Sequence, residues 1–193
     1  MKKALVIGIA GGSASGKSTL CENMEHRLSD YKVKALHLDE YFRPPAERPV
    51  APSPVTAVEY LDDNHPETMD LPAFRRDLAA ATEGDWDIVL AEGLLILWDD
   101  DTFSQLDLGV FVDCRADERI VRRLRRNMGW GLTFDQVSNV YLDLVRYRHD
   151  EYVEPSRWRA DVVVNGSRSS EKMLDMLCGW AENAVRGRCE RTG

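Results

Sequence analysis

A short segment near the amino terminus restricts the fold more than any other part of the chain. Residues 5–10 form an apolar run rich in Val and Ile, which predicts a buried strand. A turn rich in Gly and Ser follows, closes with Gly16-Lys17-Ser18, and leads into a helical pattern. Together with Gly11, this triplet fits the pattern G-x-x-x-x-G-K-[ST]. In this strand–loop–helix setting the pattern predicts a loop that binds the phosphates of a nucleotide.

The chemistry of phosphate binding explains this spacing. Glycines let backbone N–H groups curl around a phosphate, and the positive end of the following helix adds to the attraction. We expect Lys17 to reach the outer phosphates and to act in catalysis, and the Ser18 hydroxyl to ligate Mg²⁺. The alternative is a chance match in a loop rich in Gly and Ser. The predicted ATP-binding residues are Gly11, Gly12, Ser13, Ala14, Ser15, Gly16, Lys17, Ser18 and Thr19.

Composition narrows the class of protein. A chain of 193 residues with 44% hydrophobic residues can build one ordinary domain, which we expect to span residues 1–193. The net charge of −8 argues against nucleic acid as a partner. The sequence shows no signal peptide and no apolar run long enough to span a membrane, so we expect a cytoplasmic protein with no membrane partner. The sequence is compatible with a homo-oligomer.

Apolar strand patterns alternate with helical patterns along the chain, which predicts a parallel sheet with helices on both faces. We therefore expect a P-loop NTPase fold: three α/β/α layers, a five-stranded mainly parallel sheet and a helical lid over about 116–133. The segment 40–70 should lie on the substrate side. Within it, residues 43–56 hold five prolines and are expected to form an extended loop, mobile without ligand, followed by a short helix near Val58. The expected strands are 4–10, 33–38, 86–91, 108–112 and 160–164, and the main helices are 17–29, 72–82, 116–127, 134–152 and 169–186.

Three acidic residues directly follow predicted strands. Ligands of parallel sheets bind outside the carboxyl ends of the strands, so Asp39, Glu92 and Asp113 should lie at that edge. Asp39 could accept a proton from an attacking hydroxyl or hold Mg²⁺, or it could simply cap a helix. Glu92 suits a Mg²⁺-linked acid, with a strand-end carboxylate as the alternative. For Asp113 a structural role is favoured.

A run of arginines follows the fourth predicted strand. Arg119, Arg122, Arg123 and Arg126 are three and four residues apart and would share one helix face, whereas Arg125 lies off it. Like charges on one face repel each other unless an anion lies opposite, and guanidinium groups suit phosphate. The helix is therefore a candidate lid over the transferring phosphoryl group, with Arg122, Arg123 and Arg126 as catalytic residues. The alternative is a solvated face paired with the chain's many acids.

These motifs, in this order, resemble the uridine kinase family, within the group that includes phosphoribulokinase, pantothenate kinase and nicotinamide riboside kinase. The resemblance covers about 4–166. It rests on the phosphate loop at 11–18, Leu-Asp-Glu-Tyr-Phe at 38–42, Asn-His-Pro-Glu at 64–67, Glu-Gly at 92–93, the start of the lid at 111–126, and the segments 152–155 and 160–164. The resemblance implies that Asp39 is the catalytic aspartate, that Glu92 helps to hold Mg²⁺, and that substrate contacts come from Tyr41, Phe42, Asp62, Asp63, Asn64 and His65.

The chain departs from the family pattern in three places. Asn64 stands where the family usually has a ribose-binding Asp, so Asp62 or Asp63 is expected to substitute. The second arginine pair of the lid is replaced by Gly-Trp-Gly-Leu at 129–132. Uridine kinases also carry a β-hairpin that helps to enclose the base, between the helix near 72–82 and the third strand, where this chain has only residues 83–85.

The sequence thus predicts an ATP-dependent kinase that transfers the γ-phosphoryl group of ATP to a hydroxyl of a small metabolite. A nucleoside is the favoured acceptor, and nicotinamide riboside or another small metabolite is an alternative. A kinase acting on a phosphorylated or acidic acceptor, and a nucleotide-binding regulatory protein with little turnover, are the rival functions. The absence of an Asn-Lys-x-Asp motif weakens a GTPase switch.

Overall fold

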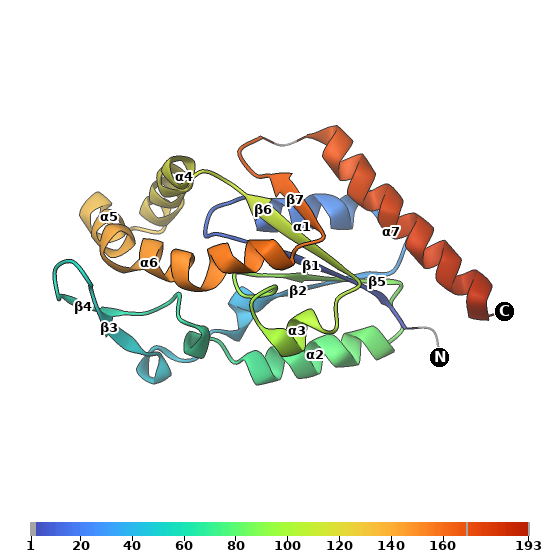
Figure 1. Cartoon of the computed structure of the whole chain (residues 1–193), viewed down its shortest axis with the longest axis horizontal. Helices are drawn as coiled ribbons and strands as arrows, with labels where there is room; N and C mark the ends of the chain where they lie inside the picture. The colour runs from blue at the N-terminus through green and yellow to red at the C-terminus, as the bar shows by residue number, and fades with distance from the viewer. Residues whose placement is uncertain (1–2, 169, 193) are drawn as a thin grey trace.

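The computed structural model describes residues 3–168 and 170–192, and it is built on a five-stranded parallel sheet (Figure 1). The strands lie in the order β2-β5-β1-β6-β7, and every neighbouring pair is parallel. This confirms the predicted α/β fold. The strands are β1 (Leu5–Gly11), β2 (Val33–His37), β5 (Ile88–Glu92), β6 (Leu108–Asp113) and β7 (Val162–Asn165).

Helices cover both faces of this sheet, as the alternating pattern predicts (Figure 1). On one face, α1 (Lys17–Arg27) and α7 (Glu171–Thr192) pack Met24 and Leu177 against β1 and β6. On the other, α2 (Leu71–Glu83) and the segment 94–97 before α3 (Asp100–Phe103) pack Phe74 and Leu95 against the sheet. Burial on both faces explains why the central strands are almost wholly apolar. No helix within the described ranges is long and apolar enough to cross a membrane.

Two helical segments lie beyond the carboxyl edge of the sheet, where the lid was predicted. The first is α4 (Ala116–Gly129). The second is one long helical segment made of α5 (Phe134–Val140), the π-helix Tyr141–Val145, α6 (Arg146–Arg148) and the π-helix His149–Val153, and it ends in the 3-10 helix Glu154–Arg159. The predicted helix over 134–152 is therefore correct in extent, but the two π-helical turns have no sequence signature.

The proline-rich segment is where the fold differs most from the prediction. A 3-10 helix (Pro45–Glu47) is followed by an antiparallel hairpin of β3 (Val50–Pro52) and β4 (Glu59–Leu61), so the short helix predicted near Val58 is wrong. The Ser53 hydroxyl fixes the turn by accepting hydrogen bonds from the backbone N–H groups of Val55 and Thr56. The prolines are compatible with this hairpin because it is a two-stranded sheet in which each strand has a free edge.

The link between α2 and β5 consists of residues 84–87 alone, as the sequence indicates. Two further 3-10 helices, Leu38–Tyr41 and Pro66–Thr68, complete the substrate side. The isolated bridge between Phe42 and Met69 joins them. Segment 38–70 is therefore folded back upon itself, with the hairpin at its tip (Figure 1).

Asp99 links α2 to α3 on the face of the sheet that these two helices cover. Its buried carboxylate caps α3 at Thr102 and accepts a hydrogen bond of 2.9 Å from Arg75 Nε of α2. Burial alone would raise the pKa of Asp99, but the hydrogen bonds from Arg75 and Thr102 outweigh it, and the pKa lies below its usual value. A lowered folded-state pKa means that the stabilisation is present above the unfolded pKa of about 3.9 and is lost as the pH falls through the folded pKa.

We predict that Asp99→Asn lowers the free energy of unfolding by about 2 kcal/mol at pH 7, less than for a fully buried pair because Arg75 is partly exposed. The difference from the wild type should shrink below about pH 4 in urea titrations. The matched control is Asp101→Asn, since Asp101 contacts the same arginine from the surface and should change stability by less than about 0.5 kcal/mol. Equal losses for both variants would contradict this account.

Candidate active site

The loop between β1 and α1 has the backbone of a phosphate cradle. Gly11 and Gly16 have φ values of 150° and 104°, in the region that favours glycine, and Ala14 adopts φ 62°. At Gly11 a Cβ atom would lie 2.6 Å from the carbonyl oxygen of Val112, so β6 leaves no room for a side chain there. Directly after Gly16 the helix α1 begins, which places its N-terminal N–H groups at the loop.

Glu92 links this loop to two neighbouring strands. Its carboxylate is almost fully buried at the end of β5, with 2% of the residue exposed. Lys17 Nζ lies 3.3 Å from Glu92 Oε1, and the Ser18 hydroxyl donates to the same oxygen at 3.2 Å. His37 Nδ1, from the end of β2, lies 3.0 Å from Glu92 Oε2. The structure thus brings together Lys17, Ser18 and Glu92, which the sequence predicts as one phosphate and metal site.

The donor set here fits Mg²⁺, the ion implied by the motif. Mg²⁺ prefers oxygen ligands and keeps several waters, so it needs only one or two protein oxygens beside the phosphates. The Ser18 hydroxyl and a Glu92 carboxylate oxygen lie side by side and meet that need. Within the described ranges no cluster of three or more His, Cys, Asp or Glu side chains is arranged to hold a metal.

Two lid arginines contact the phosphate loop directly. Arg123 Nη1 donates to the Ser13 hydroxyl at 2.8 Å, and Arg126 Nη2 donates to the same oxygen at 3.3 Å. Burial, and then repulsion from Arg126, lowers the pKa of Arg123. Arg123 Nε is buried without a hydrogen-bond partner, and neither arginine forms an ion pair within the described residues. Two unbalanced cations over the loop are what an anionic ligand would neutralise.

Arg122 does not join this pair, although the helical spacing predicts a shared face. Its guanidinium group instead donates to the backbone carbonyl of Gly166 at 2.8 Å and lies 3.3 Å from that of Ser167. It lines a cavity of about 200 Å³ beside Gly16 and Thr19, and its Nη1 atom also lies 3.4 Å from the Ser15 carbonyl oxygen of the phosphate loop. Arg122 therefore meets the phosphate loop at the Ser15 carbonyl rather than at Ser13, and its role beside the transferring phosphoryl group stays a prediction.

Two further residues reach the loop without having been predicted as site residues. Arg119 is buried and donates a hydrogen bond to the Cys114 carbonyl. It lies so close to Gly12 that a Cβ atom added there would be 2.6 Å from its guanidinium group. His149 would stand 3.0 Å from the same atom, and its Nδ1 is buried without a partner. Burial, and then the charge of Arg119, lowers the pKa of His149 to about 4, so its ring is neutral at pH 7. Nothing in the sequence separates His149 from its helical neighbours.

Asp39 lies at the same edge of the sheet, in the 3-10 helix that follows β2. The structure gives no support to the capping alternative, since the N-cap position is His37 and no side chain caps the helix. The Asp39 carboxylate is exposed and makes no hydrogen bond or ion pair in the part of the chain that the structure describes. Asp113, in contrast, is paired with Arg157 at 3.1 Å, as its favoured structural role predicts.

The predicted substrate residues at 62–65, here called the acceptor loop, separate into two groups. Asp62 is fully buried and accepts a hydrogen bond of 2.6 Å from Arg148 Nε. It is therefore not available as the replacement for a ribose-binding Asp. Asp63 is partly exposed and pairs with Arg48 at 2.9 Å. Its charge also acts on Arg123, where it raises the pKa of the guanidinium group and so opposes the larger lowering caused by burial. His65 Nδ1 accepts the Glu67 N–H, and its ring packs edge-on against another aromatic ring.

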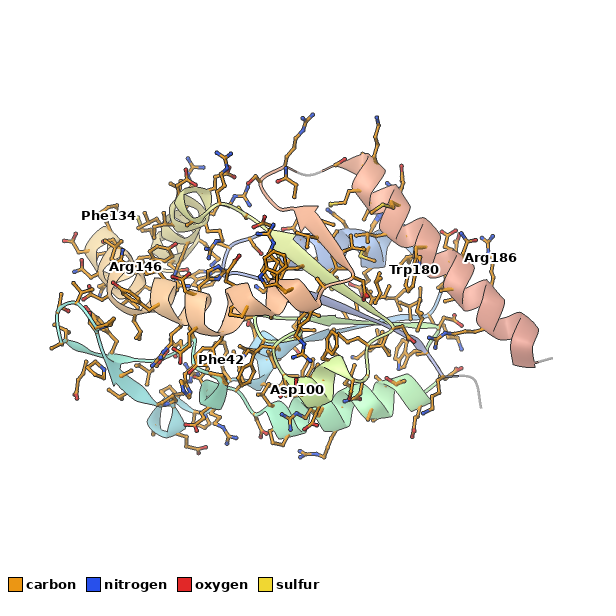
Figure 2. The ribbon with its side chains drawn as sticks, viewed as in Figure 1. Phe42, Asp100, Phe134, Arg146, Trp180 and Arg186 are labelled. Atoms are coloured by element: carbon orange, nitrogen blue, oxygen red, sulfur yellow. The ribbon has the colours of Figure 1, made fainter. Side chains whose placement is uncertain are left out.

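The predicted aromatic contacts are also engaged within the protein. The Tyr41 hydroxyl donates to Asp77 at 2.7 Å, and burial together with this hydrogen bond raises the pKa of Tyr41 to about 12. Phe42 is covered by the Arg48 guanidinium group, 4.6 Å from the ring centroid. Figure 2 shows Phe42 below the helix that bears Arg146, at the end of the molecule opposite Trp180 and Arg186.

Comparison with known proteins places this chain in a family. Residues 60–172, more than half of the chain, match the model described as Phosphoribulokinase / Uridine kinase family. The chain belongs to this family. A uridine kinase from Deinococcus deserti is 32% identical over 199 residues, which cover 91% of this chain and 94% of that protein. A uridine kinase from Clostridium botulinum (strain Okra / Type B1) is 29% identical over 196 residues, covering 92% and 95%.

Solved structures support the fold. A candidate fructose transport system kinase from Silicibacter sp. TM1040 has a TM-score of 0.69 at 16% identity, covering 85% of this chain and 91% of that one. Shikimate kinase from Bacteroides thetaiotaomicron has a TM-score of 0.56 at 16% identity, covering 94% and 98%. Family and fold together support a P-loop kinase of small metabolites, a class that uses ATP and as a rule Mg²⁺.

We predict that Lys17→Ala weakens ATP binding at least about tenfold, since one charge-assisted contact is worth more than about 1.4 kcal/mol. The measurement is a calorimetric titration of the protein with ATP, and turnover is measured in parallel. The matched control is Lys3→Ala, which removes an exposed lysine at the surface and should leave both quantities unchanged. Unchanged ATP affinity together with unchanged turnover in Lys17→Ala would overturn the assignment of the phosphate loop.

Proposed function

We propose that the protein is an ATP-dependent kinase that phosphorylates a hydroxyl group of a riboside. The observation that carries this proposal is the free carboxylate of Asp39, at the same sheet edge as the buried Lys17–Glu92 pair and the unbalanced lid arginines. A switch protein needs neither a free carboxylate beside its phosphate loop nor cations waiting above it. The family's uridine kinases point to a nucleoside as the class of acceptor.

In this proposal the phosphate loop binds the triphosphate through its backbone N–H groups and Lys17. The cavity of about 200 Å³ lined by Gly16, Thr19 and Gly166 takes the nucleotide base, and Arg122 holds its far wall through the Gly166 carbonyl. Ser18 and Glu92 would hold Mg²⁺, which neutralises phosphate charge when it is bound.

The transfer itself needs positioned groups rather than covalent chemistry by the protein. Asp39 orients the acceptor hydroxyl and takes its proton as the oxygen bonds to the γ-phosphorus, while the bond from that phosphorus to the β-γ bridging oxygen breaks and ADP leaves. Arg123 and Arg126, which already lie on Ser13, neutralise the charge that spreads over the transferring group. His149, neutral and packed against Gly12, adds no charge there.

We predict that Asp39→Asn lowers turnover by ~10²–10⁴-fold, the usual scale for a lost general base. The amide keeps the size and polarity of the side chain, so ATP binding should persist to within a small factor. The matched control is Glu40→Gln, an exposed neighbour in the same 3-10 helix, which should leave turnover near that of the wild type. Turnover of Asp39→Asn close to the wild-type value would exclude Asp39 as the base.

The acceptor side favours recognition of the ribose over recognition of the base. The link of residues 84–87 leaves no room for a hairpin between α2 and β5, and Tyr41 and Phe42 are both engaged within the protein. Asp39 remains without a partner among the described residues, and Asp63 interacts electrostatically with Arg123 of the lid. A site built to hydrogen-bond a group discriminates steeply for that group, whereas an open site does not.

We therefore predict that uridine and cytidine do not stand far above nicotinamide riboside or other ribosides as acceptors. The measurement is acceptor-dependent formation of ADP with a panel of ribosides and simple polyols. A preference for uridine and cytidine of more than ~10²-fold, about 2.7 kcal/mol of transition-state discrimination, would contradict the open base site. Activity with phosphorylated or acidic acceptors alone would favour the rival acceptor class.

A further inference from the structure

The carboxylate of Asp143 is used by none of the chemistry above. It lies in the π-helical turn Tyr141–Val145, and its Oδ2 atom accepts two hydrogen bonds from the hairpin. The Thr56 hydroxyl donates at 2.7 Å and the Tyr60 hydroxyl at 2.8 Å. The hydrogen bond to Asp143 is the main cause that raises the pKa of Tyr60, so the phenol stays a donor across the physiological range. No lysine or arginine pairs with Asp143 among the residues described.

The π-helical turns explain how one helix can hold this hairpin at two points. Asp143 binds the hairpin through Thr56 and Tyr60. Arg148 binds Asp62, the residue that directly follows the hairpin in the sequence. These two helix residues are five apart, which in a regular α-helix would place them about 140° apart around the axis. A π-helical turn has a hydrogen bond from i to i+5 and brings them closer to one face.

The acceptor loop follows β4 directly, so the hairpin determines where the loop begins. The Asp62 N–H donates to the Pro49 carbonyl across the base of the hairpin. Asp63 pairs with Arg48, at the start of the hairpin, and lies in the electrostatic field of Arg123, which contacts the phosphate loop. The hairpin is therefore the support that holds Asp63 opposite the phosphate loop. Figure 1 shows hairpin and α5 at the same end of the molecule.

From these contacts we infer that hairpin β3–β4 is the support of the acceptor loop and that Asp143 is the positioning residue that fixes it. The inference rests on the proposed function, since it gives the acceptor loop the task of binding the hydroxyl-bearing part of the acceptor. Asp143 touches neither substrate. Its loss should therefore weaken acceptor binding by the same factor for every riboside, without changing the preference among bases.

The test compares Asp143→Ala and Asp143→Asn with the matched control Asp135→Ala, an exposed aspartate in the first turn of the same helical segment. We expect Asp143→Ala to raise the acceptor KM about tenfold, equivalent to about 1.4 kcal/mol of binding, with the KM for ATP unchanged to within about twofold. Asp143→Asn keeps an acceptor oxygen and should recover part of the loss. Hydrogen exchange of residues 50–65 should be faster in Asp143→Ala than in the control.

A double-mutant cycle shows whether Asp143 acts through the hairpin. Tyr60→Phe removes one hydroxyl, and in Asp143→Ala it should add little further effect because its partner is already gone. Fully additive effects, unchanged exchange of the hairpin, or equal rises in the KM values for ATP and acceptor would each overturn the inference. If the wild type phosphorylates no riboside, the proposed function fails. The inference is then tested with whichever polyol the enzyme accepts. If it accepts none, the test is the hydrogen exchange of the hairpin together with the double-mutant cycle measured in the free energy of unfolding.

Discussion

The buried carboxylate of Glu92 is the constraint on which the nucleotide side of this structure depends. A charge at 2% exposure is costly unless it is paired, and Glu92 is balanced by Lys17, Ser18 and His37. The carboxylate thereby ties the loop after β1 to the ends of β5 and β2. In the proposed function Lys17 would turn to a phosphate, which would leave Glu92 without its cation and able to hold a metal together with the nucleotide.

The parts of the site that lie close together in the sequence could be predicted from it. The phosphate loop needs glycines and a lysine at fixed spacing, and the apolar runs of β1, β5 and β6 follow from burial on both faces of a parallel sheet. The shared position of Asp39 and Glu92 could be predicted because both lie at the carboxyl ends of neighbouring parallel strands, which meet at one edge of the sheet. These are rules of local pattern and topology, and they hold here.

The parts that depend on contacts between distant segments could not be predicted in the same way. The spacing predicts Arg122 on one face with Arg123 and Arg126, but its guanidinium group contacts carbonyl oxygens after β7, more than forty residues away, instead of Ser13. Prolines indicated an irregular segment, whereas cross-strand pairing gives a hairpin. Gly166 did carry a signal, because it follows a predicted strand at the same edge as Asp39 and Glu92.

The acceptor side shows a different balance of forces from the nucleotide side. Two of its acids are already paired, Asp62 with Arg148 and Asp63 with Arg48, whereas Arg123 and Arg126 of the lid form no ion pair among the described residues. The net charge left over the loop is therefore positive, although the chain as a whole is acidic at −8. Positive charge concentrated by pairing off nearby acids attracts the triphosphate locally, without giving the surface a general affinity for polyanions. In the proposed function an uncharged acceptor gains nothing from this field, so we expect its recognition to come from hydrogen bonds with the folded segment 38–70.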